Sequence, residues 1–450
     1  MSSSVPNQLV LRSPNANASA NKTRGSAQTF RGYYVLLLGL MALLSMLHFV
    51  LPNHAENFHS VAMTPRIGYA FNADSALFAW TVITFPQGLA TETGSVRRSR
   101  PLYSALGWAV YQPLRLMRIF VPKEIAAKAA TLARQSNTGE IWRNIDGRQI
   151  VLAFVALIGV NLFISGTALF LIFRALRASF EPRLALLLTL VPAVHSDAID
   201  FYLVPHTEPF NLLIPALFLS VLAAWSAGRD GFGWSTTLGV SMLAKPMPFM
   251  LPNWLVESVR LKRSSYVGHR NLPPTLPAGA VMLVLPTMLF LLFLDIIRVP
   301  LNNYEEVVHV PLHSNEGNQY RMFVWMLDAI RAHDPEAIPV RIISGLVEHL
   351  RLSAIAFAIP LAICVVLLVV PKRRNFRLAD EMWLHLVVYS CSCAIFWACS
   401  GYIWKRLTIT EFPLVIYALG CLSMLRCKWP EWIVSGAVVG SILTRVFGIY

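Results

Sequence analysis

Charged residues are scarce in this sequence. Only 14% of its 450 residues are charged, whereas 55% are hydrophobic and the mean hydropathy is +0.54. Soluble proteins carry about 25% charged residues, so the composition excludes an ordinary soluble globular protein. Several apolar runs instead reach the roughly 20 residues that cross a bilayer as a helix. The sequence therefore predicts a multi-pass helical membrane protein.

Acidic residues are fewer than basic ones, which gives a formal net charge of +14. In a membrane protein this excess indicates topology, because Lys and Arg gather in short cytoplasmic loops. No segment resembles a nucleic-acid-binding module, so nucleic acid is not an expected partner. The six cysteines lie in or beside late apolar segments without ligand spacing to histidine, which predicts buried thiols rather than a metal site.

The N-terminal region lacks the pattern of a cleavable signal peptide. Residues 1–32 are polar and rich in Ser and Asn, so we expect a disordered cytoplasmic tail before a transmembrane domain at 33–450. The expected fold class is all-α, a polytopic bundle of about eleven spans. The predicted spans are 33–51, 149–176, 182–196, 208–227, 233–246, 247–262, 276–297, 352–371, 382–400, 409–425 and 431–448.

Two long connections, 53–148 and 298–350, separate some of these spans and exceed ordinary loop lengths, which indicates function. Within the first, 102–120 and 122–135 are predicted to be amphipathic helices on the membrane surface. Short basic loops would all face the cytoplasm if the pass at 247–262 exists, which puts both long loops outside. These basic loops are 173–183, 260–270, 371–377 and 426–428.

A short hairpin between two of the apolar runs, "HSDAIDFYLVPHTE", contains an unusual group of ionisable residues. They are His195, Asp197, Asp200, His206 and Glu208. Pro205 and Pro209 interrupt regular helix there and make backbone groups available. The carboxylates could bind a metal, bind sugar hydroxyls or accept a proton. The alternative is a solvated turn between two spans.

Asp74 lies early in the first long loop among apolar side chains. A lone carboxylate in such surroundings is costly unless it is paired or used. Its pKa would tend to rise, which suits a general base near neutral pH. The alternative is a helix cap, with Asn72 or Asp74 starting an interfacial helix.

Three basic residues are candidates for binding an anion. Lys245 is the only charge in the proline-rich apolar run "LAKPMPFMLP", where it could bind a phosphate or extend its amine to the membrane surface. Lys405 and Arg406 precede a late span on the expected outer side, where a lipid phosphate or the headgroup region would explain them. In the second long loop, His309 and His313 could bind zinc, although a lid that binds the sugar or the acceptor is favoured.

In this order, the features resemble the GT-C superfamily of membrane glycosyltransferases, most closely the GPI mannosyltransferase II family and its bacterial relatives. "HTEPF" is similar to that family's Thr-Glu hairpin through Thr207 and Glu208. Ser196 is a further matching position upstream. "LAKPMPFMLP" resembles its second motif, with Lys245 in place of Arg and no Gly. "WKRLTITEFPL" resembles its terminal motif, with Arg406 matching and Leu407 in place of Tyr.

The resemblance implies an inverting hexosyl transfer at the non-cytoplasmic face, with mannose the expected sugar. The donor would be a polyprenyl-phosphate-linked sugar and the acceptor a glycan or glycolipid, with Asp74 as general base. No cofactor is implied, and a divalent metal is compatible but not required. Residues expected to bind substrate are His195, Ser196, Asp197, Asp200, Thr207, Glu208, Lys245, Lys405 and Arg406.

Two other functions remain open on the sequence. A transporter or flippase of lipid-linked saccharides would explain intramembrane charge and broken helices, but it predicts internal repeats that we do not find. A polymerase or ligase of surface polysaccharide would use the same face and the same class of substrate. The expected location is a bacterial inner membrane with the site facing the periplasm, and the alternative is the endoplasmic reticulum membrane with a lumenal site.

Overall fold

The chain is described by a computed structural model. The residues that it describes are 32–44, 46, 61–62, 70–71, 73–88, 101–135, 139–226, 232–241, 244, 252–253, 255–256, 326, 329–330, 332–372, 380–400 and 405–447. The elements in this part are helices, apart from one antiparallel pair of two-residue strands, β1 (Val61–Ala62) and β2 (Ala70–Phe71). The predicted helical fold class is confirmed at this level.

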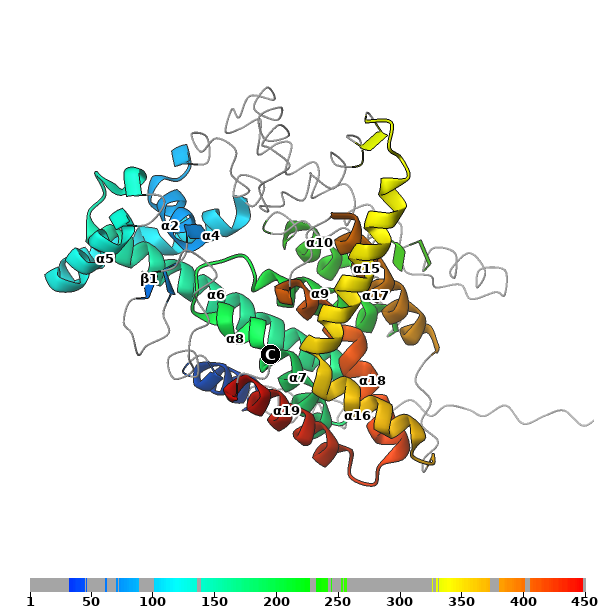
Figure 1. Cartoon of the computed structure of the whole chain (residues 1–450). Coiled ribbons are helices and arrows are strands. Elements are labelled where there is room, and N and C mark those ends of the chain that lie inside the picture. The colour runs from blue at the N-terminus through cyan, green and yellow to red at the C-terminus, as the bar shows by residue number, and fades with distance from the viewer. Residues whose placement is uncertain are drawn as a thin grey trace, which may run out of the picture.

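The long helix α6 (Gly147–Leu176) organises the fold and runs from the helices of the first long loop into the rest of the molecule (Figure 1). It begins after Asp146, whose carboxylate accepts a hydrogen bond from the backbone N–H of Arg148 at 3.0 Å. This cap satisfies a donor that has no partner within the helix. Helices packed against α6 are α2 (Ala73–Thr84), α4 (Pro101–Leu114), α5 (Lys123–Gln135), α7 (Pro182–Ala193), α8 (Ser196–Tyr202) and α9 (Phe210–Ser226).

Helices of the first long loop gather at the N-terminal end of α6 (Figure 1). They are α2 (Ala73–Thr84), α4 (Pro101–Leu114), η3 (Arg115–Phe120), α5 (Lys123–Gln135) and η4 (Gly139–Trp142). Helices do form at the two places where amphipathic helices were predicted. A Cβ on Gly147 would lie 1.9 Å from the carbonyl oxygen of Ala126, so α5 approaches α6 as closely as it does because residue 147 is glycine.

Three apolar helices follow close to the predicted runs, and one short helix, α8, forms within the predicted hairpin. They are α7 (Pro182–Ala193), α8 (Ser196–Tyr202), α9 (Phe210–Ser226) and α10 (Phe232–Ser241). Of these, α9 packs along α6, and α8 contacts α6 and α7. The predicted segment 276–297 and nearly all of 247–262 lie outside the described residues.

The C-terminal helices pack against the elements just described. They are α15 (Ala337–Ala356), α16 (Ala358–Val369), α17 (Asp380–Ser400), η6 (Lys405–Glu411), α18 (Phe412–Arg426) and α19 (Pro430–Val446). The predicted span 352–371 is not one straight helix, because α15 and α16 meet at an angle of 87°. Pro360 explains the break, since its ring would clash with the carbonyl of Ala356 four residues earlier.

Within the described part, three helices are long and apolar enough to cross a membrane. They are Gly147–Leu176, Met382–Cys399 and Leu407–Arg426, and the bent pair would make a fourth if it counts as one span. Shorter apolar helices are Gly32–Leu44, Ser75–Thr84, Pro182–Ala193, Phe210–Ser226 and Pro430–Thr444. This set is consistent with a membrane protein.

Candidate functional site

The hairpin that carries the ionisable group folds inward. After α8 the chain runs through 203–209 without regular helix, and α9 starts at Phe210, directly after Pro209. His206, Thr207 and Glu208 are each no more than 6% exposed. These three side chains are therefore part of the interior, and the solvated-turn alternative does not describe them.

Asn161 of α6 holds the hairpin in place. Its side-chain amide donates to the carbonyl of Phe201 at 3.1 Å and to that of Val204 at 2.7 Å. Its Oδ1 accepts a hydrogen bond from the Tyr103 hydroxyl at 2.8 Å, which links the hairpin to α4. A buried amide that satisfies two carbonyls and a hydroxyl prevents the cost of leaving them unpaired. The broken backbone is thus tied to two helices at once.

Glu208 has polar partners on both oxygens. His206 Nδ1 lies 3.4 Å from Glu208 Oε1, and the Asn211 side-chain amide donates to Oε2. The carboxylate also lies close to the start of α9, where the helix dipole favours a negative charge. The His206 ring packs against the rings of Phe78 and Phe201, with centroids 6.0 and 5.2 Å away. Glu208 is therefore held at a fixed place in the interior.

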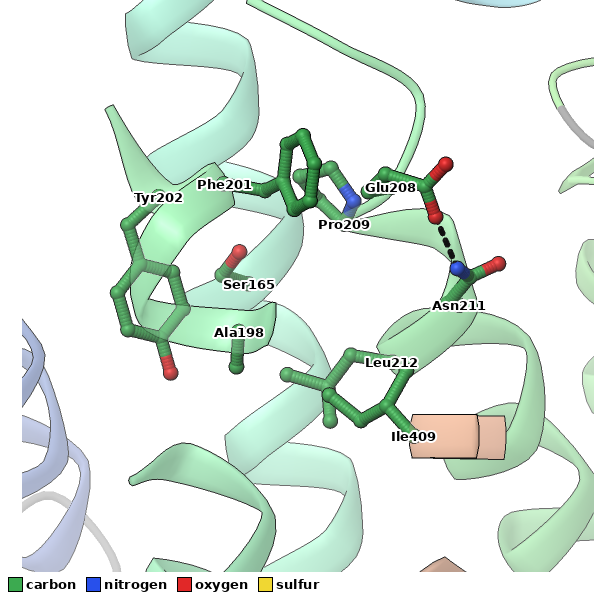
Figure 2. A pocket seen from close by; sticks show the side chains of 9 residues that line it. All are labelled: Ser165, Ala198, Phe201, Tyr202, Glu208, Pro209, Asn211, Leu212 and Ile409. Carbon is green, nitrogen blue, oxygen red and sulfur yellow. Dashed lines mark hydrogen bonds between the residues drawn. The ribbon is translucent and has the colours of Figure 1, made fainter. Parts of the chain in front are cut away.

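A small cavity adjoins this carboxylate (Figure 2). Its lining residues are Ser165, Ala198, Phe201, Tyr202, Glu208, Pro209, Asn211, Leu212 and Ile409. The volume of about 10 Å³ is room for roughly one water molecule. Figure 2 shows Glu208 and Asn211 on the side of the cavity away from Tyr202. The cavity could hold a water or a single hydroxyl group, but not a whole sugar ring.

Helix α2 brings the start of the first long loop to the hairpin. The Ser75 hydroxyl donates to the carbonyl oxygen of Pro205 at 3.0 Å, across 130 residues of sequence. The next turn adds the contact between Phe78 and His206. Asp74 is the second residue of α2, so its backbone lies next to this junction, while its side chain is outside the described part. The first turn of a helix also favours a carboxylate, so both readings of Asp74 stay open.

The other predicted residues of the hairpin are placed less completely. His195 is 4% exposed, and its ring lies against Phe357 at the bend between α15 and α16, with centroids 4.8 Å apart. Ser196, Asp197 and Asp200 lie on α8, but their side chains are outside the described part. His195 therefore contacts the C-terminal helices through the bend.

The predicted anion-binding residues fall at or beyond the limits of the described part. Lys405 and Arg406 open η6, which packs against α8 and α9, so their backbone belongs to the same region as the hairpin. Their side chains lie outside the described part, as does Lys245 as a whole. His309 and His313, named above for a zinc site or lid, also lie outside it.

A second buried histidine–glutamate pair lies nearby and was not predicted. His349 Nε2 of α15 is 3.2 Å from Oε1 of Glu411, and both residues are buried, at 0% and 8% exposed. Glu411 directly precedes α18, and Glu208 likewise lies close to a helix start, with one residue between it and α9. Ile409, which belongs to the same 3-10 helix η6 as Glu411, lines the cavity beside Glu208. The two pairs are therefore on neighbouring elements.

Thr410 fixes the element that carries this second pair. Its hydroxyl donates to the carbonyl of Leu407 at 2.7 Å and lies 3.0 Å from the Cys393 sulfur. Its carbonyl accepts a hydrogen bond from the Tyr389 hydroxyl at 3.0 Å. The indole N–H of Trp397 also donates to the Thr410 hydroxyl at 3.4 Å, so helix α17 anchors η6 by three side chains and fixes the start of α18.

One signal in the sequence could have revealed the second pair. Thr-Glu followed by Pro and Phe in either order occurs at 207–210 and again at 410–413. In both copies the Thr is fully buried and the Glu nearly so. The histidine partners have no such signal, because His349 is 62 residues away from Glu411 in the sequence.

Metal binding finds no support within the described ranges, where no three His, Cys, Asp or Glu residues lie together as ligands. The chain matches no family model, and it has no significant match among curated proteins or solved structures. A proposal of function therefore depends on the residues and contacts of this chain.

Proposed function

We propose that the protein is a glycosyltransferase that moves a hexose from a polyprenyl-phosphate carrier to a glycan or glycolipid acceptor. Mannose is the hexose that we propose. One observation carries the proposal furthest. The hydrogen bond from Ser75 to Pro205 joins the helix that contains Asp74 to the hairpin that contains Glu208. A candidate base and a fixed sugar-binding carboxylate thus belong to adjoining segments.

In this proposal Asp74 removes the proton from the acceptor hydroxyl. The acceptor oxygen then bonds to the anomeric carbon while the bond from that carbon to the phosphate oxygen breaks, and the configuration inverts. The leaving polyprenyl phosphate is a stable anion, so the reaction does not require a strong general acid. A single base is thus sufficient, and a metal is not needed to balance the step.

The remaining residues serve substrate binding. Glu208 is oriented by His206 and Asn211, so it accepts hydrogen bonds from sugar hydroxyls at a defined position. The cavity beside it has room for one such hydroxyl or for a water that bridges to one. Lys405 and Arg406 on η6 and Lys245 neutralise the carrier phosphate.

The proposed setting is a polytopic bundle of about eleven spans with this site at the non-cytoplasmic face. A bacterial inner membrane with a periplasmic site fits the short basic loops, and a lumenal site in the endoplasmic reticulum is the alternative. Membrane lipids would surround the chain in either case. The helices long and apolar enough to cross a membrane support this setting.

Transfer by the purified chain in proteoliposomes is the direct test, with polyprenyl-phosphate mannose and candidate acceptors. Asp74→Asn should lower kcat at least about 100-fold, because a general base contributes roughly that much. Glu181→Gln is the control, since Glu181 is an exposed carboxylate in the basic loop 173–183 on the expected cytoplasmic side, and it should leave the rate unchanged.

Each contrary result removes a different part of the proposal. Full activity of Asp74→Asn would remove the assignment of the base and leave the reaction. Failure of the wild-type chain to consume or bind any polyprenyl-phosphate sugar would remove the enzyme class. Movement of the lipid-linked sugar across the bilayer without a new glycosidic bond would instead identify a flippase.

A further inference from the structure

The 3-10 helix η3 exposes a concentrated group of large apolar side chains. Leu116 is 82% exposed, Ile119 is 75% exposed and Phe120 is 72% exposed, with Met117 at 50%. Such a run on a short amphipathic element is typical of a segment that inserts its apolar side chains at a membrane surface. Two arginines, Arg115 and Arg118, lie in the same six residues.

A pocket opens beside η3, at the N-terminal end of α6. Its volume is about 340 Å³, within the range of small-ligand sites. The lining residues are Tyr111, Gln112, Arg115, Leu116, Arg118, Gln149 and Leu152. The walls thus combine two guanidinium groups, two side-chain amides and a phenol with apolar side chains. This combination suits a ligand with an anionic head and an apolar tail.

The pocket is positively charged. Arg118 forms an ion pair with Asp146, the residue that caps α6. The hydrogen bonds from Arg148 and Arg118 keep the pKa of this carboxyl below its usual value, so Asp146 stays ionised and compensates one guanidinium. Arg115 bonds to the neutral side chain of Gln112 at 3.3 Å, and no carboxylate in the described part of the chain forms an ion pair with it.

Tyr111 is part of the wall of this pocket. Its side chain is buried, at 1% exposed, and Gln149 lies beside its hydroxyl. Burial raises the pKa of Tyr111, so the phenol keeps its proton and adds no negative charge to this wall at neutral pH. Arg115 lies over the Tyr111 ring at 6.0 Å, which orients the guanidinium across the pocket.

We propose that this pocket binds the phosphate group of a membrane lipid, with the lipid chain lying along the exposed apolar side chains of η3. The guanidinium of Arg115 donates to the phosphate oxygens, because a guanidinium fork matches phosphate geometry. Leu116 both lines the pocket and faces outward, so it connects head to tail. The site is separate from the hairpin, and it does not depend on sugar transfer.

Lipid binding to the full-length chain in phosphatidylcholine nanodiscs tests the proposal. The probe is a fluorescent phosphatidic acid, titrated against wild type and Arg115→Gln. Loss of one charge-assisted contact should raise the Kd roughly tenfold. Lys128→Gln is the matched control, because Lys128 is an exposed cation on the neighbouring helix α5 that does not line the pocket, and it should bind as wild type does.

A second variant tests the lipid chain separately from the phosphate. Leu116→Asn changes a side chain that is 82% exposed, so folding should be unaffected, while the Kd should rise several-fold through lost apolar contact. Inorganic phosphate at millimolar concentration should not displace the probe. Displacement by a polyprenyl monophosphate would assign the lipid as a prenyl carrier, and retention of the probe would assign a glycerophospholipid.

Two results would overturn the inference. If Arg115→Gln binds the probe as tightly as wild type and Lys128→Gln, the pocket does not hold the phosphate. If inorganic phosphate displaces the probe fully and Leu116→Asn changes nothing, the pocket is a site for a free anion rather than for a lipid.

Discussion

Asn161 is a polar side chain in the middle of an apolar helix, and it organises more of the site than any predicted residue. It bonds two carbonyls of the hairpin and the hydroxyl of Tyr103. A helical carbonyl has its own partner four residues on, but the carbonyls of an interrupted chain do not. A broken hairpin in the interior therefore needs such a residue, and here α6 supplies it.

Replacing Asn161 should destabilise the protein strongly. Asn161→Ala removes three hydrogen bonds in the interior and should cost about 3 kcal/mol or more of unfolding free energy. Ser165→Ala is the control on the same helix face, since its buried hydroxyl has no hydrogen-bond partner in the described part of the chain, and it should cost less than about 1 kcal/mol. Thermal unfolding in detergent measures both, and equal midpoints would contradict this account.

The residues that could take part in catalysis or binding were partly recognisable in the sequence. Glu208 stood out as a carboxylate beside Pro209 in an apolar region, and the structure adds the partners that hold it. The pair of His349 and Glu411 did not stand out, because each residue alone is an ordinary member of its segment. Only the packing of α15 against η6 brings them to 3.2 Å. Pairing across long separations is a property of the fold.

Among the helices, hydrophobic runs located most of the described elements to within a few residues. The span predicted from Gln149 begins two residues earlier, at Gly147, because the Asp146 cap rather than the apolar pattern sets the start. The break between α15 and α16 was missed because composition stays apolar across it. Pro360 was the available sign, since a proline lacks the backbone N–H and its ring crowds the carbonyl four residues before it.

Close packing between α5 and α6 makes one glycine sensitive. Gly147→Ala would place a Cβ against the carbonyl of Ala126, and because backbone cannot yield as a flexible side chain does, the change should cost about 1–3 kcal/mol. Gly159→Ala, on the same helix with nothing within 4 Å, should instead stabilise by up to about 1 kcal/mol.

These two substitutions differ only in their surroundings, so opposite shifts in the thermal midpoint are expected. A Gly147→Ala protein as stable as Gly159→Ala would mean that α5 does not pack on the start of α6. Loss of lipid binding together with loss of stability in Gly147→Ala would follow from the same packing, because Gln149, two residues after Gly147, lines the pocket.

At the scale of the whole molecule, the topology expected from loop charge can be tested with two exposed positions. Lys128 lies on α5 in the first long loop, and Lys428 lies in the basic loop between α18 and α19. An impermeant thiol reagent on intact cells should label Lys128→Cys and should label Lys428→Cys only after the membrane is opened. Wild type gives the background of the native cysteines. Labelling on the same side for both would contradict the outward position of the first loop.

The thirty residues of α6 have a mechanical consequence. At 1.5 Å per residue the helix is about 45 Å long, whereas the hydrocarbon core of a bilayer is about 30 Å thick. The polar residues Arg148 and Gln149 at its N-terminal end belong in the headgroup region or above it. In the proposed membrane setting, the length of α6 determines how far α5 and the pocket beside η3 lie from the lipid tails. Bilayer thickness becomes a variable that tunes this distance.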